Sequence, residues 1–141
     1  MDWKKECEEE LRLLEKRRAL VCDLKDTYIK LDAEIKEAKS PAPDGNPRAK
    51  VATESDEMLN NFVKRRNLMA RILRVESEIK AADNALERLD YKDRIVLQAF
   101  YILPLPGRIE RIMKELHVEE RTAYKYREHA LVAYCNARYG C

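Results

Sequence analysis

The 141-residue sequence has few of the features that define several large classes of protein. It contains only three glycines and five prolines, and 45% of its residues are apolar, which excludes collagen-like and extensively disordered chains. No apolar run reaches the roughly 18 residues that a membrane-spanning helix requires, so we expect no membrane partner. The first residues lack the apolar core of a signal peptide, which predicts a cytoplasmic protein.

Sequence signatures of catalytic or metal chemistry are also missing. The four cysteines form no C-x-x-C pair and no short cluster with either histidine, so we predict no metal site. The cysteines are expected to pack as small apolar residues. There is no glycine-rich phosphate loop, no H-E-x-x-H motif and no histidine with a nucleophile in a recognisable pattern. We therefore predict that the chain is not an enzyme and uses no cofactor.

Charge is abundant but nearly balanced. Charged residues make up 38% of the sequence, and the 28 basic and 26 acidic residues leave a net charge of +2. Residues 91–141 carry 9 basic and 6 acidic residues, so this segment alone carries an excess of positive charge. A basic excess at the C-terminal end weakly favours nucleic-acid binding by that segment.

The N-terminal part follows a heptad pattern that predicts one long helix, over residues 3–39. Nine of eleven positions, spaced alternately by four and three residues, are apolar, and no glycine or proline interrupts the run. These positions are Trp3, Cys7, Glu10, Leu14, Arg17, Val21, Leu24, Tyr28, Leu31, Ile35 and Ala38. Such a stripe needs a partner helix to cover it.

A second heptad stripe predicts that partner, a helix over residues 56–89. Eight of its ten positions are apolar: Met58, Asn61, Arg65, Leu68, Ile72, Val75, Ile79, Ala82, Leu86 and Leu89. The intervening segment 40–55 begins with three prolines and Gly45, which predicts a linker. We therefore expect residues 1–90 to form a long antiparallel helical hairpin resembling a coiled coil, through which the protein forms a homo-oligomer.

From residue 90 onward the pattern changes to short helices. Asp90, with Asp93 three residues later, is expected to cap a helix that ends before Pro104. A short helix from Arg108 to Leu116, a tight turn and a final helix from Glu119 to about residue 138 then follow. This succession predicts a helix-turn-helix domain over residues 91–141, and the whole protein is expected to be all-α.

The final helix carries the predicted site residues. Near its start we expect an outward face that can contact base edges or phosphates in the major groove of double-stranded DNA. The residues of this face are Glu120, Arg121, Thr122, Tyr124 and Lys125. Arg108 and Lys92 are expected to hold backbone phosphates. Two Lys-Arg-Arg triplets, at 16–18 and 64–66, are basic enough to suggest DNA contact, although solvated faces of coiled-coil helices explain them more simply.

The C-terminal segment resembles region 4 of the sigma-70 factors. Residues 86–97 and 100–102 resemble the opening of that region, residues 111–118 its Glu-Ile-Ala-x-x-Leu-Gly-Ile segment, and residues 120–131 its recognition helix. The layout of the whole chain is similar to that of the ArpU/RinA-type phage transcriptional regulators. The resemblance implies a DNA-binding transcriptional regulator encoded by a phage or prophage, with RNA polymerase as a further partner.

Four positions depart from that pattern. His117 replaces the turn glycine, Met113 a small alanine, Arg111 an acidic residue and Glu119 a serine. His117 is therefore expected to take a left-handed backbone conformation, which histidine tolerates better than most residues. Two other functions remain open: a small DNA-packaging subunit of the terminase kind, and a helical interaction protein whose helix-turn-helix no longer binds DNA.

Overall fold

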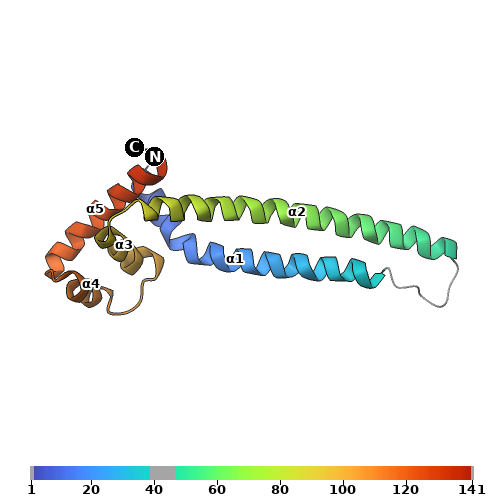
Figure 1. Ribbon diagram of the computed structural model, residues 1–141, viewed down its shortest axis with the longest axis horizontal. Coiled ribbons are helices and arrows are strands. Elements are labelled where there is room, and N and C mark those ends of the chain that lie inside the picture. The colour runs from blue at the N-terminus through green and yellow to red at the C-terminus, as the bar shows by residue number, and fades with distance from the viewer. Residues whose placement is uncertain (1, 39–46, 141) are drawn as a thin grey trace. The chain divides into compact units, whose positions relative to one another are not determined.

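The computed structural model describes residues 2–38 and 47–140, and every secondary-structure element in these ranges is helical (Figure 1). The elements in chain order are α1 (Trp3–Ala38), α2 (Pro47–Glu87), α3 (Tyr91–Leu97), the π-helical turn η1 (Gln98–Ile102), α4 (Arg108–Leu116) and α5 (Glu120–Tyr139). The predicted all-α class is confirmed. None of these helices is long and apolar enough to cross a membrane.

The chain divides into two compact units. Unit 1 contains residues 1–18 and 77–141, and unit 2 contains residues 19–76. Unit 1 therefore combines α3, α4 and α5 with the beginning of α1 and the end of α2, which the sequence analysis assigned to the hairpin. Helices α1 and α2 contribute to both units because each runs through the boundary.

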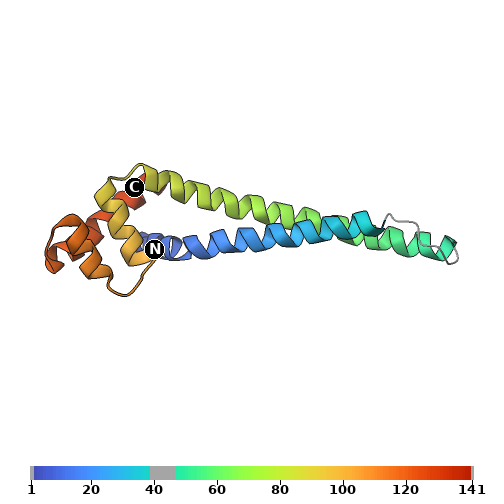
Figure 2. The ribbon, with the colours of Figure 1, turned by 60° about the horizontal axis from the view of Figure 1, so that its bottom comes forward.

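In unit 2, α1 and α2 lie side by side and run in opposite directions (Figures 1 and 2). Val21 and Leu24 on α1, and Ile72 and Val75 on α2, are buried and make up the apolar seam that the heptads predicted. Ion pairs flank this seam. Lys25 Nζ lies 2.6 Å from a carboxylate oxygen of Glu76.

The polar residues within the two predicted stripes each reach a partner on another helix. Arg65 Nη1 lies 3.2 Å from a carboxylate oxygen of Asp32. The Asn61 amide donates a hydrogen bond of 2.9 Å to the Leu31 carbonyl oxygen. In unit 1, Arg17 pairs with Glu78 at 3.6 Å, and Glu10 binds side chains of α5. Interruptions of an apolar stripe by polar residues thus mark inter-helix contacts in this protein.

Helix α2 begins earlier than expected. The predicted linker extended to residue 55, but α2 starts at Pro47. Proline is favoured at the first helical position, where its fixed φ suits the helix and its missing N–H leaves no hydrogen bond unmade. The linker was therefore predicted too long at its C-terminal end; residues 39–46, with the other two prolines, lie outside the described residues.

Trp3 also departs from its predicted role. It is the first position of the N-terminal stripe, yet it remains 41% exposed. The first residue of α1 has no preceding helical turn to cover it. Leu11, which lies outside the predicted stripe, is fully buried instead, because α1 faces α5 as well as α2 in this unit.

The core of unit 1 is formed by small and large apolar residues from all of its helices. Its fully or almost fully buried members include Leu11, Val96, Ile112, Ala123, Leu131 and Tyr134. Ala123 is completely buried near the start of α5, where a small side chain allows close approach of the neighbouring helices. This core fixes which face of α5 points to solvent.

The segment that precedes Pro104 is not a uniform α-helix. After α3 the chain forms the π-helical turn η1, and the Leu103 N–H donates a 2.8 Å hydrogen bond to the carbonyl of Gln98, five residues earlier. Asp90 occupies the N-cap position of α3, but its side chain makes no capping bond. Asp93 is buried and lies 3.2 Å from Nδ1 of His129, so the predicted capping box is wrong.

Candidate nucleic-acid interface

A left-handed turn at His117 connects α4 to α5. His117 has φ 53° and ψ 48°, which confirms the backbone conformation expected for the residue that replaces glycine. The N–H groups of His117 and Val118 both donate to the Met113 carbonyl oxygen. These bonds give a carbonyl group in the last turn of α4 its hydrogen-bond donors. Glu119 is extended and occupies the N-cap position of α5. The turn therefore redirects the chain within three residues.

The N-terminal half of α5 presents charged side chains to solvent. Glu120, Arg121, Tyr124 and Lys125 are exposed, whereas Thr122 is half-buried. Arg121 and Lys125 are four residues apart and hence share one face of the helix. Among the described residues neither side chain forms an ion pair or a hydrogen bond. The structure thus places four of the five predicted α5 residues on one accessible surface.

Tyr124 is anchored within this surface by its ring. The centroid of its ring lies 5.8 Å from that of Phe100, and the guanidinium of Arg127 lies 5.5 Å from the Tyr124 centroid. The side chain nevertheless remains 41% exposed. A ring held on one side and open on the other can stack against a base or a sugar without losing much conformational entropy.

The two predicted phosphate contacts outside α5 differ in their surroundings. Arg108, at the start of α4, is exposed and its guanidinium lies 5.4 Å from the Phe100 ring centroid. Lys92 is half-buried, and its ammonium lies only 3.5 Å from the centroid of the Tyr126 ring. Lys92 is therefore already engaged in a cation–π contact, which makes it a weaker candidate for binding phosphate.

Acidic groups lie beside the cationic face. Glu119 and Glu120 stand at the N-terminal end of α5, where the helix dipole favours negative charge. In α4, Arg111 is neutralised by Glu115 at 3.1 Å. The cations that remain for an external anion on this surface are therefore chiefly Arg121, Lys125 and Arg108.

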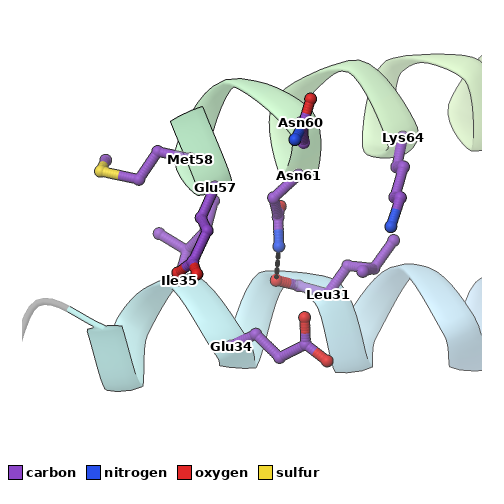
Figure 3. Close-up of a pocket in the computed structure, with 8 residues that line it drawn as sticks. All are labelled: Leu31, Glu34, Ile35, Glu57, Met58, Asn60, Asn61 and Lys64. Atoms are coloured by element: carbon purple, nitrogen blue, oxygen red, sulfur yellow. Dashed lines mark hydrogen bonds between the residues drawn. The ribbon is translucent and has the colours of Figure 1, made fainter. Parts of the chain in front are cut away.

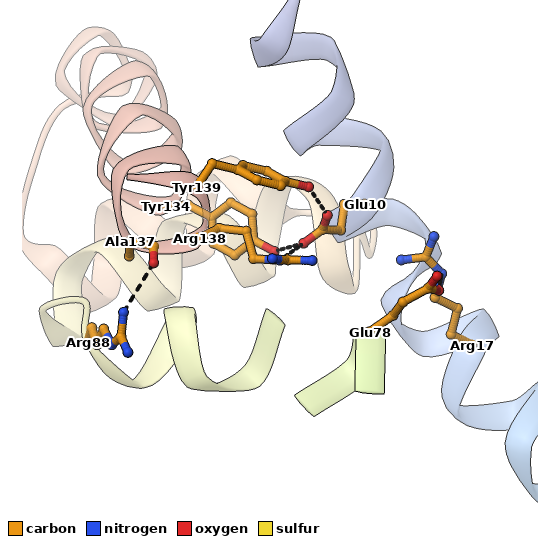
Figure 4. A network of polar contacts seen from close by, with 8 residues as sticks. All are labelled: Glu10, Arg17, Glu78, Arg88, Tyr134, Ala137, Arg138 and Tyr139. Carbon is orange, nitrogen blue, oxygen red and sulfur yellow. Dashed lines mark hydrogen bonds and ion pairs between the residues drawn. The ribbon is translucent and has the colours of Figure 1, made fainter. Parts of the chain in front are cut away.

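A polar network that the sequence analysis missed fixes the C-terminal end of α5 to α1 (Figure 4). The Glu10 carboxylate accepts hydrogen bonds from the hydroxyls of Tyr134 and Tyr139 and from Nε of Arg138, the last at 2.9 Å. Glu10 is only 11% exposed. Its place in a largely apolar heptad stripe was the available signal, because a carboxylate there requires partners.

The network shifts the pKa values of its members. Burial alone raises the pKa of Glu10, but the two tyrosine hydroxyls and the positive charge of Arg138 outweigh it, so the pKa lies below its usual value. Burial and the neighbouring carboxylate raise the pKa of Tyr139 to about 12 and also raise that of Tyr134. Glu10 is therefore ionised and both tyrosines are neutral at pH 7.

The pocket in unit 2 that Figure 3 shows does not resemble the cationic surface of α5 or the Glu10 network. It has a volume of about 300 Å³ and lies between α1 and α2, with Leu31, Glu34, Met58, Asn61 and Lys64 among its lining residues. The Asn61 amide is already bound to the Leu31 carbonyl across it. In the described part of the chain no three histidine, cysteine or acidic side chains are grouped as a metal site would require.

Comparison of the chain with models of protein families, with curated proteins and with solved structures finds no match.

Proposed function

We propose that this protein binds double-stranded DNA, with α4, the turn at His117 and α5 acting as a helix-turn-helix whose second helix enters the major groove. One observation carries the proposal. Arg121 and Lys125 are exposed and without ionic partners on the face of α5 opposite the buried Ala123 and Ala130. Cations that serve neither the core nor an internal ion pair are available for phosphates and base edges.

Each residue of the α5 surface has a chemical role in this proposal. Arg121 and Lys125 donate to guanine or to phosphate oxygens, and Glu120 accepts from the exocyclic amino group of cytosine. Tyr124 supplies a ring already fixed against Phe100. Arg108 contacts a phosphate from the start of α4, while half-buried Thr122 and the engaged Lys92 contribute less.

We further propose that α1 and α2 form a hairpin through which two copies associate. On α2, Leu59, Phe62, Met69 and Leu73 are 38–61% exposed and follow a heptad spacing that is separate from the buried seam. A second heptad stripe on the outside of a helix pair is typical of helices that pack against another pair. Dimers are common among helix-turn-helix proteins, because two copies read two half-sites.

The biological role proposed is control of transcription in a phage or prophage, with RNA polymerase as a second partner. The likeness of residues 86–131 to region 4 of the sigma-70 factors supports this role. A DNA-packaging subunit would also bind DNA, and transcription from a reporter fused to the bound sequence distinguishes the two.

The test compares two double variants. In the first, Arg121→Ala and Lys125→Ala remove the proposed contacts; in the second, Arg71→Ala and Lys80→Ala remove one arginine and one lysine from exposed positions of α2. We expect only the first variant to weaken binding to a selected duplex, by roughly 1–3 kcal/mol per base-contacting residue. Equal losses in the two variants would show that only net charge matters. No binding by the wild type at low salt would refute the proposal and favour the interaction protein.

A further inference from the structure

A second cationic site lies in unit 1, between the beginning of α1 and the η1–α4 segment. It is a pocket of about 410 Å³, which is within the range of pockets that hold small ligands. Arg12, Glu15 and Lys16 line it from α1, Phe100 and Tyr101 from η1, and Arg108 from α4. Lys16 belongs to the first Lys-Arg-Arg triplet, for which the proposed function gives no role.

The π-helical turn shapes the floor of this pocket. Phe100 and Tyr101 are adjacent in sequence, and both rings are almost fully buried, with centroids 6.3 Å apart. Consecutive residues are rotated about the helix axis by a larger angle in an α-helix than in the wider π-turn. Such turns are frequent at functional sites. Here the turn directs two neighbouring aromatic rings toward the same group of cations.

Three guanidinium groups converge on these rings. Arg12 lies 5.5 Å from the centroid of Tyr101, and Arg108 and Arg127 each lie 5.4 Å from the centroid of Phe100. Arg127 pairs with Glu128 through Nη2 at 3.7 Å, and its buried Nε has no hydrogen-bond partner within the described residues. Arg12 and Arg108, which line the pocket, are thus held against its two aromatic residues.

The carboxylates nearby neutralise only part of this charge. Glu15 is the acidic residue of the pocket lining, and it pairs with Arg18 at 3.3 Å. Glu8 pairs with Arg12 through Oε2 at 3.9 Å, and its other oxygen, Oε1, accepts a hydrogen bond from the Tyr101 hydroxyl. Lys16 and Arg108 form no ion pair in the part of the chain that the structure describes. Lys16 and Arg108 thus bring positive charge to the pocket that no ion pair within the described residues balances.

We propose that this pocket binds a phosphate group, held by the guanidiniums of Arg12 and Arg108 and the ammonium of Lys16. Arginine forks match phosphate oxygens in geometry, and lysine adds a point charge. The chemistry is the same whether the phosphate is a diester of the DNA backbone or part of a free phosphorylated ligand. The site does not depend on the proposed reading of DNA by α5.

The first experiment asks whether phosphate binds, with inorganic phosphate as the probe. Amide resonances of the ¹⁵N-labelled full chain are followed during titration with sodium phosphate, and sodium chloride at equal ionic strength serves as the reference. We expect saturable shifts at Phe100, Tyr101 and Arg108 with phosphate alone. The double variant Arg12→Gln and Lys16→Gln should abolish them. The variant Arg71→Gln and Lys80→Gln, which loses the same charge elsewhere, should retain them.

Absence of phosphate-specific shifts in the wild type, or shifts that persist in the variant lacking Arg12 and Lys16, would overturn the proposal. Because both replaced side chains are largely solvent-facing, the variant is expected to keep the wild-type spectrum outside the pocket. If the spectrum of the double variant changes throughout, the single variant Lys16→Gln is used in its place. This single variant should weaken phosphate binding several-fold.

The second experiment identifies the source of the phosphate once it is shown to bind. The salt dependence of binding to a mixed-sequence duplex is measured for the wild type and for the variant lacking Arg12 and Lys16. A slope that falls by about one unit for each lost contact assigns the pocket to a backbone phosphate. An unchanged slope together with lost phosphate binding assigns it to a free phosphorylated ligand. A wild type that binds phosphate but no duplex refutes DNA binding and leaves this site intact.

Discussion

The replacement Glu10→Gln tests how the C-terminal end of α5 is fixed to α1. In the native protein the Glu10 carboxylate accepts three hydrogen bonds, from Tyr134, Arg138 and Tyr139, and is almost fully buried. Glutamine has nearly the same shape, so the change removes charge and one acceptor oxygen without creating a cavity. The remaining amide group places a donor where the carboxylate accepted a hydrogen bond.

The magnitude follows from the number and kind of bonds lost. A hydrogen bond to a charged group contributes about 1.5–3 kcal/mol to stability. The glutamine oxygen can retain the bonds from Tyr134 and Arg138 in weakened form, because both go to the same oxygen of Glu10, while the Tyr139 hydroxyl loses its acceptor. Arg138, which is 23% exposed, recovers part of its solvation from water. We therefore expect Glu10→Gln to lower the free energy of unfolding by about 2–4 kcal/mol at pH 7.

The effect of this replacement should depend on pH. The pKa of Glu10 is lower in the folded protein than its ordinary value of 4.5, because bonds from the tyrosines and Arg138 outweigh the effect of burial. The stabilisation is therefore fully present above about pH 4.5 and is lost as pH falls through the lower pKa of the folded state. The difference in stability between wild type and variant should be constant near neutral pH and should shrink below about pH 4.5.

Urea denaturation followed by far-ultraviolet circular dichroism measures both effects. The matched control is Glu9→Gln, since Glu9 is the exposed neighbour of Glu10 and should tolerate the change within about 0.5 kcal/mol. The reasoning fails if Glu10→Gln costs no more than Glu9→Gln, or if its cost stays constant between pH 7 and about pH 3.

Three further predictions concern the turn, the seam and the oligomer. His117→Gly should raise the free energy of unfolding by up to about 1 kcal/mol, because glycine adopts φ 53° without strain; a loss of stability in urea denaturation would show that the histidine side chain contributes more than the strain costs. Ile72→Asp should cost several kcal/mol, since Ile72 is only 3% exposed, whereas the exposed Arg71→Asp should cost far less; similar thermal melts would place Ile72 outside the seam. Sedimentation at high micromolar concentration should show a dimer that Phe62→Glu dissociates, and a monomeric wild type would contradict the proposed use of the α2 stripe.

The heptad and short-helix patterns were sufficient to predict the helical class and the order of the helices. Apolar residues at a spacing of 3.5 have one physical explanation, a stripe that another helix covers, and Leu24 and Ile72 are buried accordingly. The αL conformation at His117 was predicted from the resemblance, in which a glycine stands at this position of the turn. The start of α2 was not predicted, because prolines terminate one helix as readily as they begin another.

The contacts that depend on tertiary placement could not be predicted. Leu11 is buried against residues far away in sequence, and Glu10 binds α5 across 124 to 129 positions. The π-turn that places Phe100 beside Tyr124 and Arg108 depends on one extra residue per turn, which has no clear periodic signal. For the same reason the sequence predicted the exposed cations of α5 but not the cationic pocket.

Fluorescence anisotropy of a labelled mixed-sequence duplex, titrated with the wild-type protein over a series of salt concentrations, tests the central claim most directly. If α5 presents Arg121 and Lys125 to DNA, the logarithm of the binding constant falls linearly with the logarithm of salt concentration. The slope should decrease by up to about two units when both residues are replaced by alanine, and it should remain unchanged for Arg71→Ala with Lys80→Ala. A wild-type protein that does not bind the duplex at low salt, or a slope unaffected by the loss of Arg121 and Lys125, would contradict the account.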